Sequence, residues 1–317
     1  MRPAPARIHA RPWPMKPLAQ FITRGPAQAA LVAWGTGVLS LLLPFVGLLS
    51  SATVALVTLR NGSGYGVRVG ALAGLGCMVL CTLLLGSPWP ALAVVLILWL
   101  PVWVLAAVLR FSRSLAFTAQ VAGLVGAGAM LAIHVLVADP GHYWLRLMEP
   151  FQAALVKDGG LDADVAQALF ASLTPWLTGA FAAALMLQVL LGLFIGRWWQ
   201  AQVYNPGGFG ADFRSFRLHP LFGIAGVSLA VAGGWWPGPG LITDLLLVLS
   251  PLWLMQGLAV IHQLHTERGA HRRWLVGFYV LLVAFMPRTL VLVACIGLVD
   301  IWADLRVRLG RRPDSPG

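Results

Sequence analysis

Apolar segments about as long as a membrane is thick recur along the whole chain. A hydrocarbon core of about 30 Å needs roughly 20 apolar residues in a helix. Clear segments that approach or exceed this length are residues 65–84, 90–109, 114–137, 174–196, 221–236 and 241–264. Since they do not alternate polar and apolar residues as barrel strands do, the sequence predicts an all-α, polytopic transmembrane helical bundle.

Two longer apolar runs, residues 29–59 and 274–302, each hold a proline near the middle. The first would form a helix of about 46 Å, which exceeds the membrane thickness, and Pro44 is the natural place for a break. In the second, Arg288 follows Pro287, and a charge at mid-membrane costs at least about 2.5 kcal/mol. We therefore expect two helical hairpins, and about 8–10 spans in total depending on how these runs fold.

The charge distribution predicts the orientation in the membrane. The chain is 59 % hydrophobic and 10 % charged, with a net charge of +11, and its basic residues lie in short loops between apolar runs. With ten spans, Arg146, Lys157 and Arg288 lie on one side and every other basic cluster on the opposite side. By the positive-inside rule, we expect an inner-membrane protein with both termini cytoplasmic and no nucleic-acid partner. The expected parts are a basic tail (1–26), one transmembrane domain (27–309) and a second tail (310–317).

Residues 139–173 form an insertion on the predicted outer side. YWLRLMEPFQAALV and LDADVAQALFASL have amphipathic patterns and are separated by Asp158, Gly159 and Gly160. They predict two amphipathic helices that lie along the interface or cap the bundle. An ordered external loop and a lid over a substrate pocket are both open interpretations.

The polar segment 197–220 contains NPGGFGADFRSFRL and lies on the predicted cytoplasmic side. Pro206 and Gly207 suit the two central positions of a type II turn, and Asp212 is expected in the first turn of a short helix that carries Arg214 and Arg217. No Gly-Lys-Ser/Thr sequence follows, so nucleotide binding by a Walker motif is rejected. We call residues 197–220 the elbow; its candidate residues are Asn205, Pro206, Gly207, Gly208, Phe209, Arg214 and Arg217.

Two interpretations of the elbow remain open. It is a structural connection, or it docks a partner through Arg214 and Arg217. These arginines could contact lipid phosphates, an acidic groove of a partner, or Asp212 and the acidic end of segment 300–306.

Together with GLVDIWADLRVRL near the C-terminus, this block resembles the YybS-like family of bacterial integral membrane proteins, whose function is unknown. The resemblance runs from about the first span to Arg308. That family is distantly similar to the substrate-binding S components of energy-coupling factor transporters. The resemblance implies a small solute as ligand and, as partners, membrane lipids, other integral membrane subunits or an ATPase module.

Polar residues inside apolar segments are candidates for function, because each needs a partner or a cavity. Candidate solute-pocket residues are Gln120, His134, Gln188, Asp244 and Gln256. We expect Gln188, Asp244 and Gln256 to share a cavity in the outer half of the bundle. The alternatives are helix-to-helix hydrogen bonds for the glutamines, a satisfied interface histidine for His134 and a helix-start carboxylate for Asp244. Asp300, Asp304 and Arg306 are expected to form a C-terminal anchor through local ion pairs.

Small residues predict close helix packing at two places. Gly62, Gly66, Gly70 and Gly74 recur at every fourth position, and Ala29, Ala33 and Gly37 form a similar stripe. The second stripe is similar to the one through which S components engage their transmembrane partner.

Motifs for catalysis and metal binding are missing from the sequence. It has no His-Glu-x-x-His or Gly-x-Ser-x-Gly, and Cys77, Cys81 and Cys295 lie in apolar segments without metal-ligand spacing. We therefore predict no enzyme activity, cofactor or metal. The leading hypothesis is a protein that binds or moves a small solute, and the alternative is a non-transporting scaffold in envelope assembly.

Overall fold

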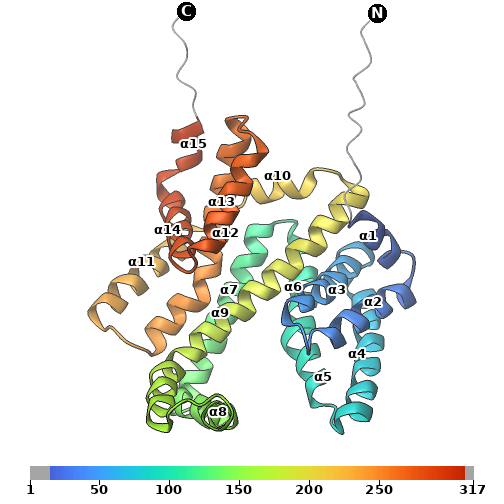
Figure 1. The fold of residues 1–317 in the computed structure, drawn as a ribbon. Coiled ribbons are helices and arrows are strands. Elements are labelled where there is room, and N and C mark those ends of the chain that lie inside the picture. Colours follow the sequence, from blue (N-terminus) through green and yellow to red (C-terminus); the bar gives the residue numbers. More distant parts are fainter. Residues whose placement is uncertain (1–14, 311–317) are drawn as a thin grey trace, which may run out of the picture. The chain divides into compact units, whose positions relative to one another are not determined.

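The computed structural model describes residues 15–310, and every regular element in that range is helical (Figure 1). The predicted all-α class is therefore confirmed. Within the predicted basic tail, α1 forms over Lys16–Ile22. The rest of that tail up to residue 14, and residues 311–317 of the C-terminal tail, lie outside the described range.

Five of the described helical segments are long and apolar enough to cross a membrane. They are α4 (Ser63–Leu85), Trp89–Ser112, α7 (Leu115–Leu136), α9 (Ala163–Tyr204) and α12 (Leu241–Glu267). The segment Trp89–Ser112 comprises α5 (Trp89–Ala93), a π-helical stretch η2 (Val94–Trp99) and α6 (Leu100–Ser112). These segments indicate a multi-pass membrane protein.

The other expected spans correspond to shorter helices: α2 (Pro26–Leu39), α3 (Gly47–Asn61), α11 (Pro220–Trp235), α13 (Arg272–Ala284) and α14 (Arg288–Ala303). At 13 to 16 residues, they reach only about 20–24 Å. The bent pair of α13 and α14, counted as one span, raises the described number to six. The predicted 8–10 spans thus include helices shorter than the hydrocarbon core.

Both predicted breaks in the long apolar runs are present. The helix α2 ends at Leu39, and a short 3-10 turn η1 (Pro44–Val46) precedes α3. The chain bends by 119° between α13 and α14, beside Pro287. In each case a proline, which cannot donate a backbone hydrogen bond, stands at the break.

The chain divides into two compact units. The first unit contains the described residues up to Arg110 together with Leu191–Phe209, and the second contains Phe111–Leu190 and the residues from Gly210 onward. The helix α9 contributes to both units.

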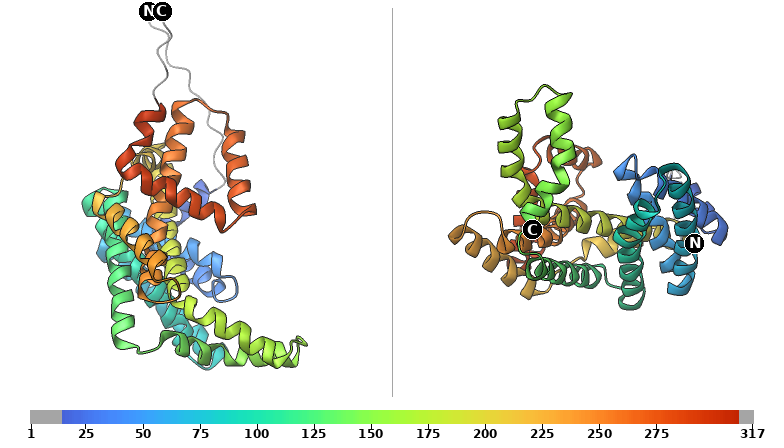
Figure 2. Two further views of the ribbon diagram at one scale, coloured as in Figure 1. Left: turned by 90° about the vertical axis from the view of Figure 1, so that its left-hand side faces the viewer. Right: turned by 90° about the horizontal axis from the view of Figure 1, so that it is seen from below.

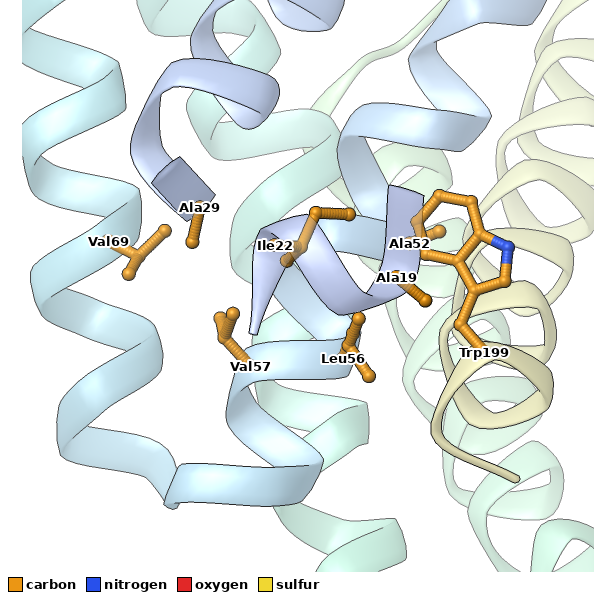
Figure 3. Close-up of a cluster of buried hydrophobic side chains, with 8 residues drawn as sticks. All are labelled: Ala19, Ile22, Ala29, Ala52, Leu56, Val57, Val69 and Trp199. Carbon is orange, nitrogen blue, oxygen red and sulfur yellow. The ribbon is translucent and has the colours of Figure 1, made fainter. Parts of the chain in front are cut away.

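The first unit has a core to which α1, α2, α3, α4 and the C-terminal part of α9 contribute side chains. Figure 3 shows this core, which consists of Ala19, Ile22, Ala29, Ala52, Leu56, Val57, Val69 and Trp199. Three of its eight members are alanines, which permit close approach of the helices, and Trp199 is its largest side chain.

The stripe of Ala29, Ala33 and Gly37 is buried inside this unit. Ser50 Oγ on α3 donates to the Ala33 carbonyl at 2.8 Å and accepts from Trp99 Nε1 at 2.8 Å. The stripe is therefore covered by the protein itself and does not offer the partner surface that the resemblance implies.

Only part of the glycine stripe makes close contacts. Gly62 caps α4 at φ 101°, whereas a Cβ on Gly74 would stand 3.2 Å from Val95. Gly66, Gly70 and Gly74 also line an apolar groove of about 420 Å³.

In the second unit, α12 and α14 form the most extensive helix pair. They cross at Gly257 and Gly297, where a Cβ on Gly297 would stand 2.6 Å from the Gly257 backbone nitrogen. The absence of side chains at both positions permits this approach.

One prediction for the outer insertion is wrong. The first amphipathic helix exists as α8 (Pro140–Lys157), but the second is not separate, because α9 continues without interruption for 42 residues. Pro175 lies inside α9 and does not end it. The paired rings of Phe151 and Phe170, 6.1 Å apart, join α8 to the first half of α9, and the two helices lie side by side (Figure 2).

Candidate functional site

A cavity of about 250 Å³ lies within the second unit, where the C-terminal end of α7 meets α8, the first half of α9 and the start of α12. Its polar lining comprises His134, Asp139, His142, Thr174, Thr178 and Asp244. Two of these, His134 and Asp244, belong to the predicted solute-pocket set.

His134 and Asp244 form a pair although they are 110 residues apart in sequence. His134 Nε2 and Asp244 Oδ2 are 2.8 Å apart. Asp244 is 2 % exposed and lies in the first turn of α12, where the helix dipole favours negative charge. The predicted helix-start position is confirmed, and the carboxyl group also has a histidine partner.

Two buried polar atoms of the cavity lining have no hydrogen-bond partner among the described residues. They are Asp244 Oδ1 and Thr174 Oγ1. An unpaired buried polar group costs about 1–3 kcal/mol, so such atoms need an explanation. Both are hydrogen-bond acceptors, and both belong to residues that line the cavity.

The walls of the cavity are held by close contacts. Trp144 Nε1 on α8 donates to Thr178 Oγ1 on α9 at 2.9 Å. A Cβ on Gly179 would stand 2.8 Å from the Cα of Asp244, so glycine permits α9 to approach α12 here. Asp139 Oδ1 caps α8 by accepting from the His142 amide at 2.9 Å.

The remaining members of the predicted pocket lie elsewhere. Gln256 follows Asp244 by about 18 Å along α12, too far to share a small cavity. Gln120 Oε1 accepts from the His219 amide at 2.9 Å, and half-buried Gln188 is not part of the cavity lining. The structure therefore does not place Gln188, Asp244 and Gln256 around one space.

The elbow contains the predicted turn. The Gly208 amide donates to the Asn205 carbonyl at 3.0 Å, and Gly207 has φ 88°, as the third position of a type II turn requires. In the first unit, the Phe209 ring lies 6.2 Å from that of Phe194.

Asp212 is not where the sequence predicts it. The short helix α10 (Gly208–Arg214) begins directly after the turn, so its first turn holds no acidic residue and Asp212 falls near its end. The sequence prediction assumed that the helix begins close to Asp212. Gly207 and Gly208 form a turn that lets the helix begin four residues before it.

Arg306, at the start of α15 (Leu305–Gly310), ties the elbow to the C-terminal helices. Its Nη1 and Nη2 donate to the carbonyls of Arg214 and Phe216 at 2.5 and 2.6 Å. Nη2 also lies 3.2 Å from Asp300 Oδ2. Burial lowers the pKa of Arg306, and Asp300 partly counters this effect.

Gln256 completes this buried network. Its Nε2 donates to Asp300 Oδ2 at 3.0 Å, and its Oε1 accepts from the Leu218 amide at 2.8 Å. The backbone groups of the elbow thus find partners in side chains from α7, α12 and α15, and Asp300 of α14 binds the side chains of Gln256 and Arg306.

An exposed ion pair lies beside the network. Arg217 Nη2 is 2.6 Å from Asp304 Oδ1, and the side chains are 51 % and 40 % exposed. The hydrogen bond from Arg217 holds the pKa of the Asp304 carboxyl below its ordinary value. Of the predicted anchor, Asp300 pairs with Arg306 within the C-terminal segment, whereas Asp304 binds the elbow.

Sequence reasoning did not identify Thr174, Thr178 or Gly179, and it gave no hint that Arg306 is buried. Hydroxyls and glycines are common in apolar helices, so nothing local marks these as cavity residues. No group of three or more His, Cys, Asp or Glu side chains within residues 15–310 is placed to hold a metal ion.

Comparison of the chain with protein-family models, with curated proteins and with solved structures finds no match. Functional inference therefore depends on the geometry described above.

Proposed function

We propose that this multi-pass membrane protein binds a small solute bearing N–H or O–H donors in the cavity between α7, α8, α9 and α12. The observation that carries the proposal is Asp244, which lines a polar cavity and whose buried Oδ1 has no partner among the described residues. In this proposal, donors of the solute bind Asp244 and the hydroxyl of Thr174, which lines the same cavity.

The dimensions favour a small ligand. Sites for drug-sized molecules occupy about 300–1,000 Å³, and this cavity of about 250 Å³ falls just below that range. Its lining mixes hydroxyl, imidazole and carboxyl groups, which suits a short amine or polyol better than an apolar compound.

The charge distribution supports an orientation for this site. With the basic loops cytoplasmic, the cavity opens toward the outer side of an inner membrane, under α8, and both termini are cytoplasmic. Such a protein would act as a solute-binding component like an S component and would need other subunits, such as an ATPase module, for energised transport.

The alternative function, a scaffold that docks a partner through Arg214 and Arg217, has less support. The backbone around Arg214 is held by Arg306, and the Leu218 amide by Gln256. These contacts favour a structural role for the elbow.

Thermal unfolding of the detergent-purified protein tests the proposal with ethanolamine, putrescine and glycerol as probes and with tetramethylammonium as a donor-free control. We expect a donor-bearing probe to raise the melting temperature of the wild type. Thr174→Val and Asp244→Asn should abolish the shift, whereas Asp164→Asn, an equal charge change at an exposed position, should retain it. Equal shifts in wild type and Asp244→Asn, or none with any probe, would refute solute binding of this kind.

A further inference from the structure

A second polar cavity, of about 580 Å³, lies at the other end of α12 in the second unit. Its lining includes Arg214, Arg217, Gln263, Thr266, Glu267 and Arg306. Gln263 follows Asp244 by about 28 Å along the helix, so this space is separate from the proposed solute cavity.

The most prominent polar group of this cavity is the guanidinium of Arg214. Its side chain is half-buried, and its guanidinium makes no hydrogen bond or ion pair with any described residue. A Cβ on Gly210 would stand 3.0 Å from Arg214 Nη1, so the glycine leaves room for the guanidinium. All five N–H donors of this arginine are therefore available.

Arg306 also lines this cavity and is not fully hydrogen-bonded. Its two terminal nitrogens are engaged by the elbow carbonyls and Asp300, but its buried Nε has no partner among the described residues. A buried N–H of a charged guanidinium is costly to leave unpaired.

The other polar groups of the lining leave the guanidinium groups as the main donors. The hydroxyls of Ser215 and Thr266 donate to the carbonyls of Asp212 and His262. Gln263 Nε2 donates to Glu267 Oε1, and exposed Glu267 is the acidic residue of this lining.

Arg217 belongs to the same lining and is paired with exposed Asp304. Exposed pairs of this kind contribute little to stability, and the pair engages only two of the five donors of Arg217. The Arg217 guanidinium can therefore bind a further oxyanion at little cost in stability, even if the pair with Asp304 weakens.

We propose that this cavity binds a phosphate group through Arg214, Arg217 and Arg306. A guanidinium group can donate two parallel N–H hydrogen bonds to two oxygens of one phosphate, and such charge-assisted hydrogen bonds are strong. An anionic phospholipid headgroup and a free phosphate share this chemistry, and the cavity volume admits a phosphate together with an attached group.

Isothermal titration of the full chain in neutral detergent tests the proposal with inorganic phosphate and with dihexanoyl phosphatidylglycerol. Sodium chloride at matched ionic strength and dihexanoylglycerol, which lacks the phosphate, are the ligand controls. We expect at least one phosphate probe to bind the wild type saturably. Neither ligand control should bind.

Arg214→Gln should weaken this binding about tenfold or more, because it removes a charged donor. Arg146→Gln, the same change at an exposed position on α8, should bind as the wild type does. Glu267→Gln removes the carboxyl group from the lining and should tighten binding. Because the Arg214 guanidinium has no internal partner, its replacement should leave the melting temperature nearly unchanged.

Binding of the lipid alone identifies a headgroup site, and binding of both probes identifies a site for phosphate itself. The proposal is overturned if neither phosphate probe binds, if dihexanoylglycerol binds as well as the lipid, or if Arg214→Gln binds as tightly as the wild type.

Discussion

Replacement of Gly297 by alanine tests how the buried network depends on the crossing of α12 and α14. The new Cβ would clash with the Trp253 carbonyl oxygen and would stand 2.6 Å from the Gly257 backbone nitrogen. Ordinary contact begins at 3.4 Å, so the helices must separate by more than about 0.8 Å. The hydrogen bond from Gln256 Nε2 to Asp300 Oδ2, now 3.0 Å, would then lengthen to about 3.8 Å, beyond hydrogen-bonding range.

The expected loss has two parts. Overpacking costs about 1–3 kcal/mol, and a buried polar group left without its partner costs about 1–3 kcal/mol more. We therefore expect Gly297→Ala to lower the free energy of unfolding by about 2–6 kcal/mol. The elbow should also become more sensitive to proteolysis, because Gln256 holds the Leu218 amide.

Thermal and denaturant unfolding in detergent, followed by limited proteolysis, would measure both effects. Gly277→Ala is the matched control, since Gly277 lies within α13 and a Cβ there would meet nothing within 4 Å. If Gly297→Ala unfolds at the same denaturant concentration as Gly277→Ala, the inferred close crossing is incorrect.

Three other predictions concern the elbow and the topology. Gly207→Ala should reduce the free energy of unfolding by about 1 kcal/mol in denaturant titrations, because φ is 88° there and the space is open. Arg217 lowers the pKa of Asp304 in the folded protein. The wild type should therefore be more stable than Asp304→Asn above pH 3.8, and this difference in stability should disappear as the pH falls through the lowered pKa. A difference between the two acid-unfolding curves that does not change with pH would contradict this. In a cysteine-free background, a cysteine at position 214 should react with impermeant reagents only from the cytoplasm and one at position 158 only from outside; the reverse pattern would invalidate the topology.

Features that depend on local sequence were predictable. The apolar runs indicate membrane helices, Pro44 and Pro287 mark the breaks, and Pro206 with Gly207 specifies the turn. In each case the decisive physics, burial of an apolar segment or a restricted backbone dihedral, acts within a few residues.

Features that depend on distant residues were not predictable. The pairing of His134 with Asp244 joins positions 110 residues apart, and each residue alone suits a simpler interpretation. The tightest helix crossing uses Gly257 and Gly297, single glycines without the fourfold spacing that drew attention to Gly62–Gly74. The continuity of α9 was missed because an amphipathic pattern that ends at residue 173 and an apolar segment that begins at residue 174 read as separate elements, whereas one helix contains both.

The contacts of Arg306 also impose an order on biosynthesis. The carbonyls of Arg214 and Phe216 receive their hydrogen bonds from a residue 92 and 90 positions later in the chain. During translation the elbow therefore emerges long before the side chain that completes it, and those carbonyls must remain hydrated or bound to other molecules in the interval. A nascent chain truncated before α15 would retain its apolar helices and still lack the residue that fastens this loop, so the elbow is completed only after α15 has been synthesised.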